Sequence, residues 1–225
     1  MSTIRGIRWF ILFLFVHFGT AFSQTNDFEI WSSVQFRKNI GTKIRLLLQE
    51  EFRFNENAAR IDEYFTELGI AYSLNKYVEV TAYYRFIREQ QPISVYSNFH
   101  RFYGDVKLEY EIRRFAISYR FRIQSKYTDI FSDENGLVPT NYHRNKIQLE
   151  YDIRRSRLFP YFSYELFYNL NVERNDFIKA RYTLGAEYFT RRKNKIKIFY
   201  RIQDRFNRTD PVTSYILGIG YSYRF

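Results

Sequence analysis

The sequence has no cysteine, four prolines and a single methionine among its 225 residues. Without cysteine, the chain has no disulfide framework, no thiolate zinc site, no cysteine nucleophile and no lipid-modified cysteine anchor. It also lacks a long apolar run beyond the N-terminus, and its mean hydropathy of -0.46 excludes a membrane protein built from helices. A soluble β protein or an outer-membrane β-barrel remains.

Aromatic and basic residues are what the chain has in excess. Phe, Tyr and Trp make up 21% of it, and the formal net charge is +11. This aromatic content excludes a disordered chain, whose composition is aromatic-poor. Basic and aromatic residues alternate in the tripeptide Arg120-Phe121-Arg122, as they do in some nucleic-acid-binding proteins. An export signal at the N-terminus and the strand periodicity of the chain explain this alternation better, so we expect no nucleic-acid partner.

The first 23 residues predict a secretory signal peptide. Arg5 and Arg8 precede an apolar run at residues 9–18, and the small residues Ala21 and Ser23 come just before Gln24. The alternative is a membrane anchor, but a spanning helix needs about twenty apolar residues, roughly twice the length of this run. We expect residues 1–23 to be cleaved and residues 24–225 to form one barrel domain.

Beyond Asn26, apolar residues occupy every second position, which is the periodicity of β-strands. Many of the segments are about ten residues or more, the length that a tilted membrane-spanning strand needs. The segments cover residues 28–36, 44–54, 64–72, 78–86, 102–112, 115–123, 147–153, 162–168, 180–188, 196–202 and 215–225. The pattern predicts an all-β fold.

One face of these segments is nearly free of charge, with Glu50 as the main exception, while the other face carries the charged residues. A soluble sandwich alternates in the same way. However, long segments, aromatic residues near their ends and connections that alternate between short and long are typical of outer-membrane barrels. We therefore predict a transmembrane, antiparallel, up-and-down β-barrel.

The last residues predict both location and partners. Tyr221, Tyr223 and Phe225 form an aromatic-alternating final strand that ends on Phe. This ending resembles the signal by which outer-membrane barrels are recognised for assembly. We expect the chain in the outer membrane of a Gram-negative bacterium, with outer-membrane lipid and the barrel-assembly machinery as partners.

The number of segments raises a question of parity. There are eleven, whereas single-chain bacterial barrels have even numbers of strands. If the ten segments from Thr42 onward close a barrel, the first segment, residues 27–37, starts on the outside. It then enters the lumen as a plug, lies along the seam, or pairs in a twelve-strand barrel. We expect ten to twelve strands.

The charged faces predict a basic lumen. By alternation, 21 basic and 12 acidic residues point inward. The candidate basic residues of the lumen are Arg45, Arg53, Lys107, Arg120, Arg122, Arg181, Arg201 and Arg205, and their candidate acidic partners are Glu51, Glu67, Asp105, Glu109, Glu150, Glu165 and Glu187. Two interpretations stay open. Either side chains neutralise each other and fill the interior, or the basic excess concentrates small anions in a narrow pore.

Two further functions are considered, a lipid-modifying enzyme and a surface-binding or adhesion barrel. His100 and His143, with Ser97 and Ser132 in nearby loops, are the candidates for acyl chemistry, but no G-x-S-x-G motif is present. The longest loop, residues 128–141, is the candidate binding surface. Its Asp129, Asp133 and Glu134 match no twelve-residue calcium loop. We expect no metal, no cofactor and no catalytic residue.

Several short stretches resemble a known family. They are residues 28–31, 50–54, 64–69, 74–77 and 221–225. In them the chain resembles an uncharacterised family of small outer-membrane barrels, domain of unknown function 2490. The resemblance implies a barrel in the outer membrane, and it brings no activity, substrate or catalytic residue.

Overall fold

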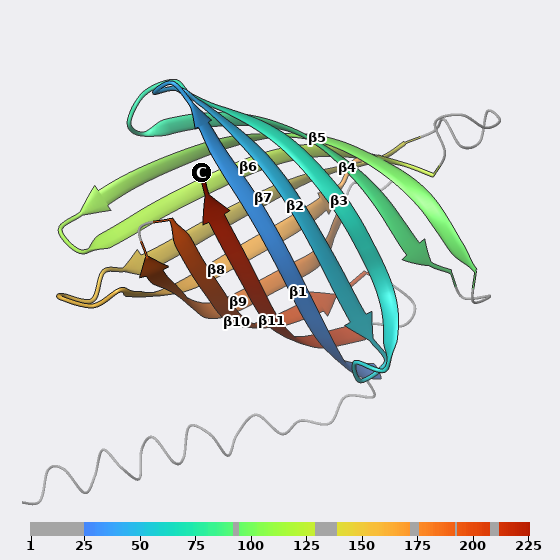
Figure 1. Ribbon diagram of the computed structural model, residues 1–225. Coiled ribbons are helices and arrows are strands. Elements are labelled where there is room, and N and C mark those ends of the chain that lie inside the picture. The colour runs from blue at the N-terminus through green and yellow to red at the C-terminus, as the bar shows by residue number, and fades with distance from the viewer. Residues whose placement is uncertain (1–24, 92–94, 129–138, 172–175, 192, 208–211) are drawn as a thin grey trace, which may run out of the picture.

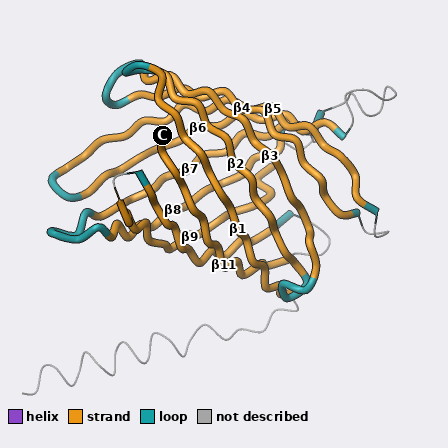
Figure 2. Tube along the Cα trace, viewed as in Figure 1, coloured by secondary structure: helices purple, strands orange, loops and turns teal. Residues whose placement is uncertain are grey.

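The computed structural model describes residues 25–91, 95–128, 139–171, 176–191, 193–207 and 212–225. The expected signal peptide, Ser132 and the three acidic residues of the longest loop lie outside these ranges. Strands make up most of the described chain (Figure 2). They are β1 (Thr25–Ile40), β2 (Ile44–Asn55), β3 (Arg60–Ser73), β4 (Val78–Gln90), β5 (Tyr96–Ile112), β6 (Phe115–Tyr127), β7 (Thr140–Tyr151), β8 (Leu158–Asn169), β9 (Asp176–Arg191), β10 (Asn194–Arg205) and β11 (Val212–Arg224). Within the described ranges, no helix has the length and apolarity to span a membrane.

The strands form one closed barrel in the order β1-β11-β10-β9-β8-β7-β6-β5-β4-β3-β2 (Figure 1). Ten of the eleven neighbouring pairs are antiparallel and follow each other along the chain. An all-β barrel with ten to twelve strands is thus confirmed.

The pairing departs from the expected antiparallel pattern at one place, where the first and last strands meet. β1 pairs with β11 in parallel, from Thr25 opposite Val212 to Arg37 opposite Arg224. A parallel pair joins two strands that run in the same direction, so an odd number can close without a free edge. The first segment therefore lies in the seam, and the described residues contain neither a plug nor a twelfth strand.

The two ends of the barrel differ in their connections. One end, here called the short-turn end, carries the links at 41–43, 74–77, 113–114, 152–157 and 192–193 and the C-terminus. Gly41 permits the first of these turns, since its φ of 64° is in the left-handed region that other residues disfavour. The opposite end, the loop end, carries the other five links and Thr25.

Alternation in the strands produces a barrel with an apolar exterior and a charged interior. Outward side chains are large, apolar and exposed, for example Leu184 at 65% and Ile147 at 55%. The buried side chains include many that are polar or charged, among them Glu67, Arg85 and Arg122. This distribution is the reverse of a water-soluble domain, whose charged residues are almost never fully buried unless paired.

Candidate functional site

The inward side chains of all eleven strands surround a cavity of about 620 Å³. It reaches from Lys179 and Arg205, near the loop end, to Glu187 and Lys195, near the short-turn end.

Some luminal rings lie flat over glycines of the neighbouring strand. A Cβ at Gly69 would fall 2.6 Å from the ring of Tyr83, and one at Gly218 would fall 2.0 Å from that of Phe199. Glycine at these positions lets the rings lie against the wall.

The charges that line the cavity are divided between two walls. Among the described residues, fourteen Lys or Arg and eight Asp or Glu side chains line the cavity. Strands β1 to β4, the acidic wall, contribute six of the acids and two of the bases. Strands β5 to β11, the basic wall, contribute the other twelve bases and two acids. A lumen divided in this way attracts anions mainly to one side.

Both arginines of the acidic wall, Arg53 and Arg85, donate hydrogen bonds to carboxylates. Arg53 donates from Nε to Glu51 at 2.7 Å and from Nη1 to Glu63 at 3.1 Å. Arg85 donates from Nε to Glu67 at 2.6 Å, and the Tyr103 hydroxyl also donates to Glu67. Bonds to charged partners of this kind satisfy buried guanidinium groups that would otherwise be costly to remove from water.

The basic wall has too few carboxylates for its arginines. Asp105 accepts a bidentate pair of hydrogen bonds from Arg122, with both N–O distances 2.6 Å, and Arg120 lies 3.9 Å from it. Glu165 is shared more widely. Arg120 approaches it at 2.5 Å and Arg144 at 2.8 Å, and Arg181 lies 3.8 Å away. One negative charge therefore faces three guanidinium groups.

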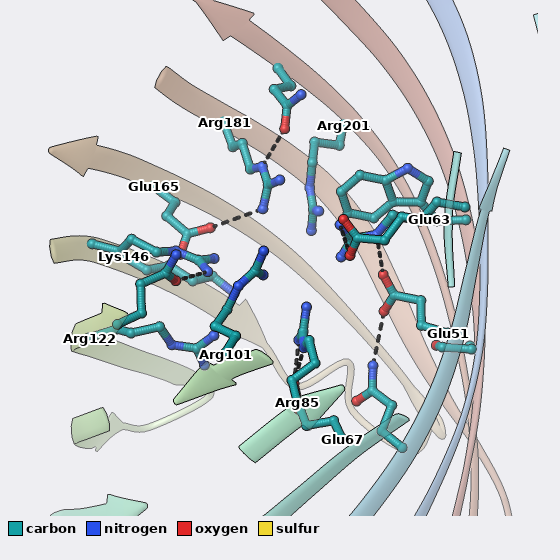
Figure 3. Close-up of a pocket in the computed structure, with 18 of the residues that line it drawn as sticks. Glu51, Glu63, Glu67, Arg85, Arg101, Arg122, Lys146, Glu165, Arg181 and Arg201 are labelled. Atoms are coloured by element: carbon teal, nitrogen blue, oxygen red, sulfur yellow. Dashed lines mark hydrogen bonds and ion pairs between the residues drawn. The ribbon is translucent and has the colours of Figure 1, made fainter. Parts of the chain in front are cut away.

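Five luminal cations have no ion pair with any described residue. They are Arg101, Lys146, Lys179, Arg201 and Arg205. Two of these donate to neutral groups, Arg201 to the Thr183 hydroxyl at 2.9 Å and Lys146 to Gln148 at 2.9 Å. Figure 3 shows Arg101 and Arg201 pointing into the space between the walls, together with Arg181. The basic wall thus presents charge that no protein carboxylate neutralises.

The structure brings most of the residues predicted for the lumen together. Those that line the cavity are Arg53, Arg120, Arg122, Arg181, Arg201, Arg205, Glu51, Glu67, Glu165 and Glu187. Asp105 is buried beneath Arg122. The remaining four, Arg45, Lys107, Glu109 and Glu150, lie outside the cavity lining, toward the short-turn end. There Arg45 pairs with Glu79, and Lys107 pairs with Glu109 while both stay more than 40% exposed.

Several luminal residues near the loop end lie outside the alternating segments from which the candidates were predicted. Glu63, Arg144 and Lys179 line the cavity. Trp31 lines it as well, and the guanidinium group of Arg53 lies 3.9 Å from the centroid of the Trp31 ring. The alternating segments predicted from the sequence start at residues 64, 147 and 180, so they exclude Glu63, Arg144 and Lys179. The strands of the structure that contain them, β3, β7 and β9, start earlier, at residues 60, 140 and 176. Extending the same alternation toward the loops would have found all three.

The two candidate histidines, His100 and His143, lie on the outer face rather than in the cavity. His100 accepts or donates a 2.8 Å hydrogen bond with the Tyr84 hydroxyl, and His143 stacks on Tyr168 at 4.7 Å between ring centroids. Ser97 has the opposite parity from His100 on β5, so the two side chains lie on different faces. Within the described ranges no group of three or more His, Cys, Asp or Glu is arranged to hold a metal.

The three terminal aromatic residues lie on the outside of the last strand. Tyr221 donates its hydroxyl to Asn194 at 3.3 Å, and the rings of Tyr223 and Phe225 meet edge to face at 4.9 Å. Phe225 also contacts Phe36 across the seam, with 6.1 Å between the ring centroids. These contacts place the C-terminal aromatic residues beside both β10 and β1.

Comparison with known proteins identifies a family but no individual relative. The search of curated proteins finds no match to this chain. The family model described as protein of unknown function (DUF2490) matches residues 28–214, which extends from β1 into β11. Since this match covers most of the sequence and includes nine complete strands, β2 to β10, the chain belongs to the DUF2490 family.

Proposed function

We propose that the protein is a β-barrel of the Gram-negative outer membrane whose basic lumen admits small anions. Membrane insertion is supported by the outer face, where large apolar side chains are exposed on every strand. Soluble monomers rarely expose contiguous apolar patches larger than a few hundred Å². The strands are 12 to 17 residues long, more than the 9 to 11 or so that a transmembrane strand needs.

The observation that carries the anion preference is the imbalance of charge in the cavity, fourteen bases against eight acids. Several of the cations have no carboxylate partner in the described chain, so they are available to a solute. A narrow lumen with walls of low dielectric constant strengthens the field of such charges. The cavity therefore favours chloride and other small anions over potassium.

The test is electrical. The protein is reconstituted in planar bilayers, and the reversal potential is measured across a KCl gradient. We expect chloride to be more permeant than potassium. Arg201→Gln should lower the chloride-to-potassium permeability ratio about twofold, because it removes an unpaired charge from the basic wall. Arg120 and Arg122 are less informative, since removal of either disturbs a buried ion pair.

Arg45→Gln is the matched control. Arg45 also has inward parity, but it pairs with Glu79 and lies outside the cavity lining. Its removal should leave the permeability ratio unchanged within error. A folded protein without conductance, or one selective for potassium, would contradict the proposal and favour a barrel with a purely structural interior.

A further inference from the structure

Three cations surround one aromatic ring at the loop end of the lumen. The charged groups of Arg144, Lys179 and Arg181 lie 4.3, 4.5 and 4.7 Å from the centroid of Phe167. Each of these charges is therefore within about 9 Å of the other two. The face of an aromatic ring attracts cations but carries no net charge. Phe167 thus holds the three groups close together without neutralising them.

Lys179 is at the centre of this concentration of charge. Arg205 lies directly opposite it on β10, and Arg181 follows it on the same face of β9. Arg144 and Arg181 lie against the same Phe167 ring as Lys179, Arg101 lines the same cavity, and no ion pair joins Lys179 to a described carboxylate. Glu165, which is paired with Arg181 in the ladder of β8 and β9, is already shared by the guanidinium groups of Arg120, Arg144 and Arg181.

Two of the arginines around Lys179 also have unused donors. The Nε atoms of Arg101 and Arg205 are buried and have no hydrogen-bond partner among the described residues. Neither guanidinium forms an ion pair with a described carboxylate. Buried donors in native proteins are almost always satisfied, so these arginines indicate a missing acceptor. Both side chains line the cavity, which gives an acceptor room to bind.

We propose that Arg101, Lys179, Arg181 and Arg205 form a binding site for a small molecule that carries a phosphate group. A phosphate dianion has several oxygen acceptors, and guanidinium groups bind such oxygens in bidentate geometry. The four cations come from three strands, so one tetrahedral group between them contacts several donors at once. A monoanion such as chloride neutralises only one charge and leaves most donors unused.

The size of the cavity defines the class of ligand further. Its volume of about 620 Å³ is within the range of small-molecule sites, and it is much larger than a phosphate ion. Because this volume belongs to the whole lumen and the four cations lie at its loop end, a phosphate ester or a diphosphate bound to them has room to extend along the lumen. The inference rests on the proposed access of anions to the lumen, but it does not require that they cross the membrane.

The test measures binding rather than transport. The full chain in nonionic detergent micelles is titrated with inorganic phosphate and with pyrophosphate by calorimetry, at constant ionic strength set with NaCl. We expect saturable binding of both, with pyrophosphate tighter. Lys179→Gln and Arg205→Gln should each weaken binding about tenfold, the loss expected for one charge-assisted contact.

Lys195→Gln is the control, because it removes the same charge from the same lumen. Lys195 lies near the short-turn end and is paired with Glu187 at 2.7 Å. Its removal should change phosphate affinity less than twofold. Absence of saturable phosphate binding, or an equal loss in the Lys195 and Lys179 variants, overturns the site.

Thermal unfolding separates a ligand site from a structural cluster. Without phosphate, the unfolding temperature of Lys179→Gln should equal or exceed that of the wild-type protein, because the substitution removes one of several like charges that repel each other. With phosphate, the wild-type protein should gain thermal stability and the variant should not. A lower unfolding temperature for the phosphate-free variant would show a structural role and overturn the proposal.

The two proposals fail in different ways. If the protein binds phosphate but shows no conductance, the proposed pore is wrong and the phosphate site stands. If it conducts anions but does not bind phosphate, the phosphate site is wrong and the pore stands.

Discussion

At the scale of single residues, aromatic rings position cations inside the barrel. The Trp31 ring centroid lies 3.9 Å from the guanidinium of Arg53, 4.9 Å from that of Arg201 and 5.2 Å from that of Arg181. The indole N–H donates to Glu29 at 2.8 Å, which fixes the ring. The electron-rich face of the ring attracts these cations. Because a ring contributes no negative charge, this packing keeps the lumen basic.

A carboxylate on the outer face gives a prediction at the same scale. Glu50 is on the apolar side of β2, directly opposite Val34 and Thr66, and forms no ion pair with a described residue. In a membrane this charge faces lipid, which is unfavourable. We expect Glu50→Leu to raise the free energy of unfolding by about 1 kcal/mol. Denaturant titration in lipid vesicles, followed by Trp31 fluorescence, measures it.

Glu51 is the matched control for this change. It is the next residue on the same strand, but it points inward and accepts hydrogen bonds from Arg53 at 2.7 Å and Gln49 at 2.9 Å. Glu51→Leu should lower the free energy of unfolding by about 2 kcal/mol, because it leaves a buried guanidinium short of one partner. If both variants shift stability in the same direction, the outer face of β2 is not in lipid.

Much of the candidate site could be predicted at this scale, because alternation determines which face a residue occupies. Arg53, Arg181 and Glu165 were assigned to the lumen in that way and do line the cavity. Alternation contains no information on the position of a residue along the barrel axis. It therefore predicts that Lys107 and Glu109 belong to the lumen like the others, although both lie outside the cavity lining. It also cannot show that Glu165 serves three arginines, because they come from three different strands.

At the scale of elements, the seam is the feature that sequence could not determine. Parity fixes the faces of β1 but not its neighbour or direction. The ladder between β1 and β11 extends from Thr25 to Arg37, as long as the antiparallel ladders around it. A ladder of this length provides hydrogen-bond partners for the backbone N–H and C=O groups along the facing edges of both strands. A barrel in lipid requires such partners. The long ladder is why β1 lies in the wall and not in the lumen.

Because the chain has no cysteine, engineered disulfides can test the parallel register. Ser33 and Gly220 are paired across the seam, and a Cβ at Gly220 would lie 2.9 Å from the Ser33 hydroxyl oxygen. We expect Ser33→Cys combined with Gly220→Cys to form a disulfide under mild oxidation, since paired residues have suitable Cα separations. Altered mobility on a denaturing gel, reversed by reductant, reports it.

The control pair combines Ser33→Cys with Ser222→Cys. Ser222 lies on the same face of β11 but two residues farther along, opposite Gln35. The separation of these Cα atoms is then more than about 7 Å, beyond the reach of a disulfide. Efficient crosslinking of the control pair, or none in either pair, would contradict the register of the seam.

At the scale of the whole molecule, the apolar exterior and the charged interior follow from one sequence pattern. The pattern predicted the sign of the luminal charge. The separation into an acidic wall of β1 to β4 and a basic wall of β5 to β11 also follows from it once the strands are placed in sequence order, whereas the pairing of individual charges across the lumen does not. The separation matters for the proposed function, since a uniform mixture of the same charges would leave fewer cations without partners.

An odd number of strands also places the two chain ends on opposite sides of the barrel. Thr25 begins β1 at the loop end, while Phe225 follows β11 at the short-turn end. Outer-membrane barrels usually have short turns in the periplasm and longer loops outside. In that orientation the beginning of β1 is at the cell surface, even though a signal peptide is cleaved in the periplasm. If cleavage follows residue 23 as expected, the new N-terminus must then cross the membrane during assembly.

Epitope tags on intact cells test this topology. We expect a tag inserted before Thr25 to bind antibody as readily as one in the loop-end turn at residues 56–59. A tag in the short-turn link at residues 41–43 should bind only after the outer membrane is permeabilised. If the tag before Thr25 instead requires permeabilisation while the tag at 56–59 does not, β1 does not run parallel to β11 in the membrane. The barrel would then close through its other ten strands, and Trp31 would leave the wall that it shares with Arg181 and Arg201.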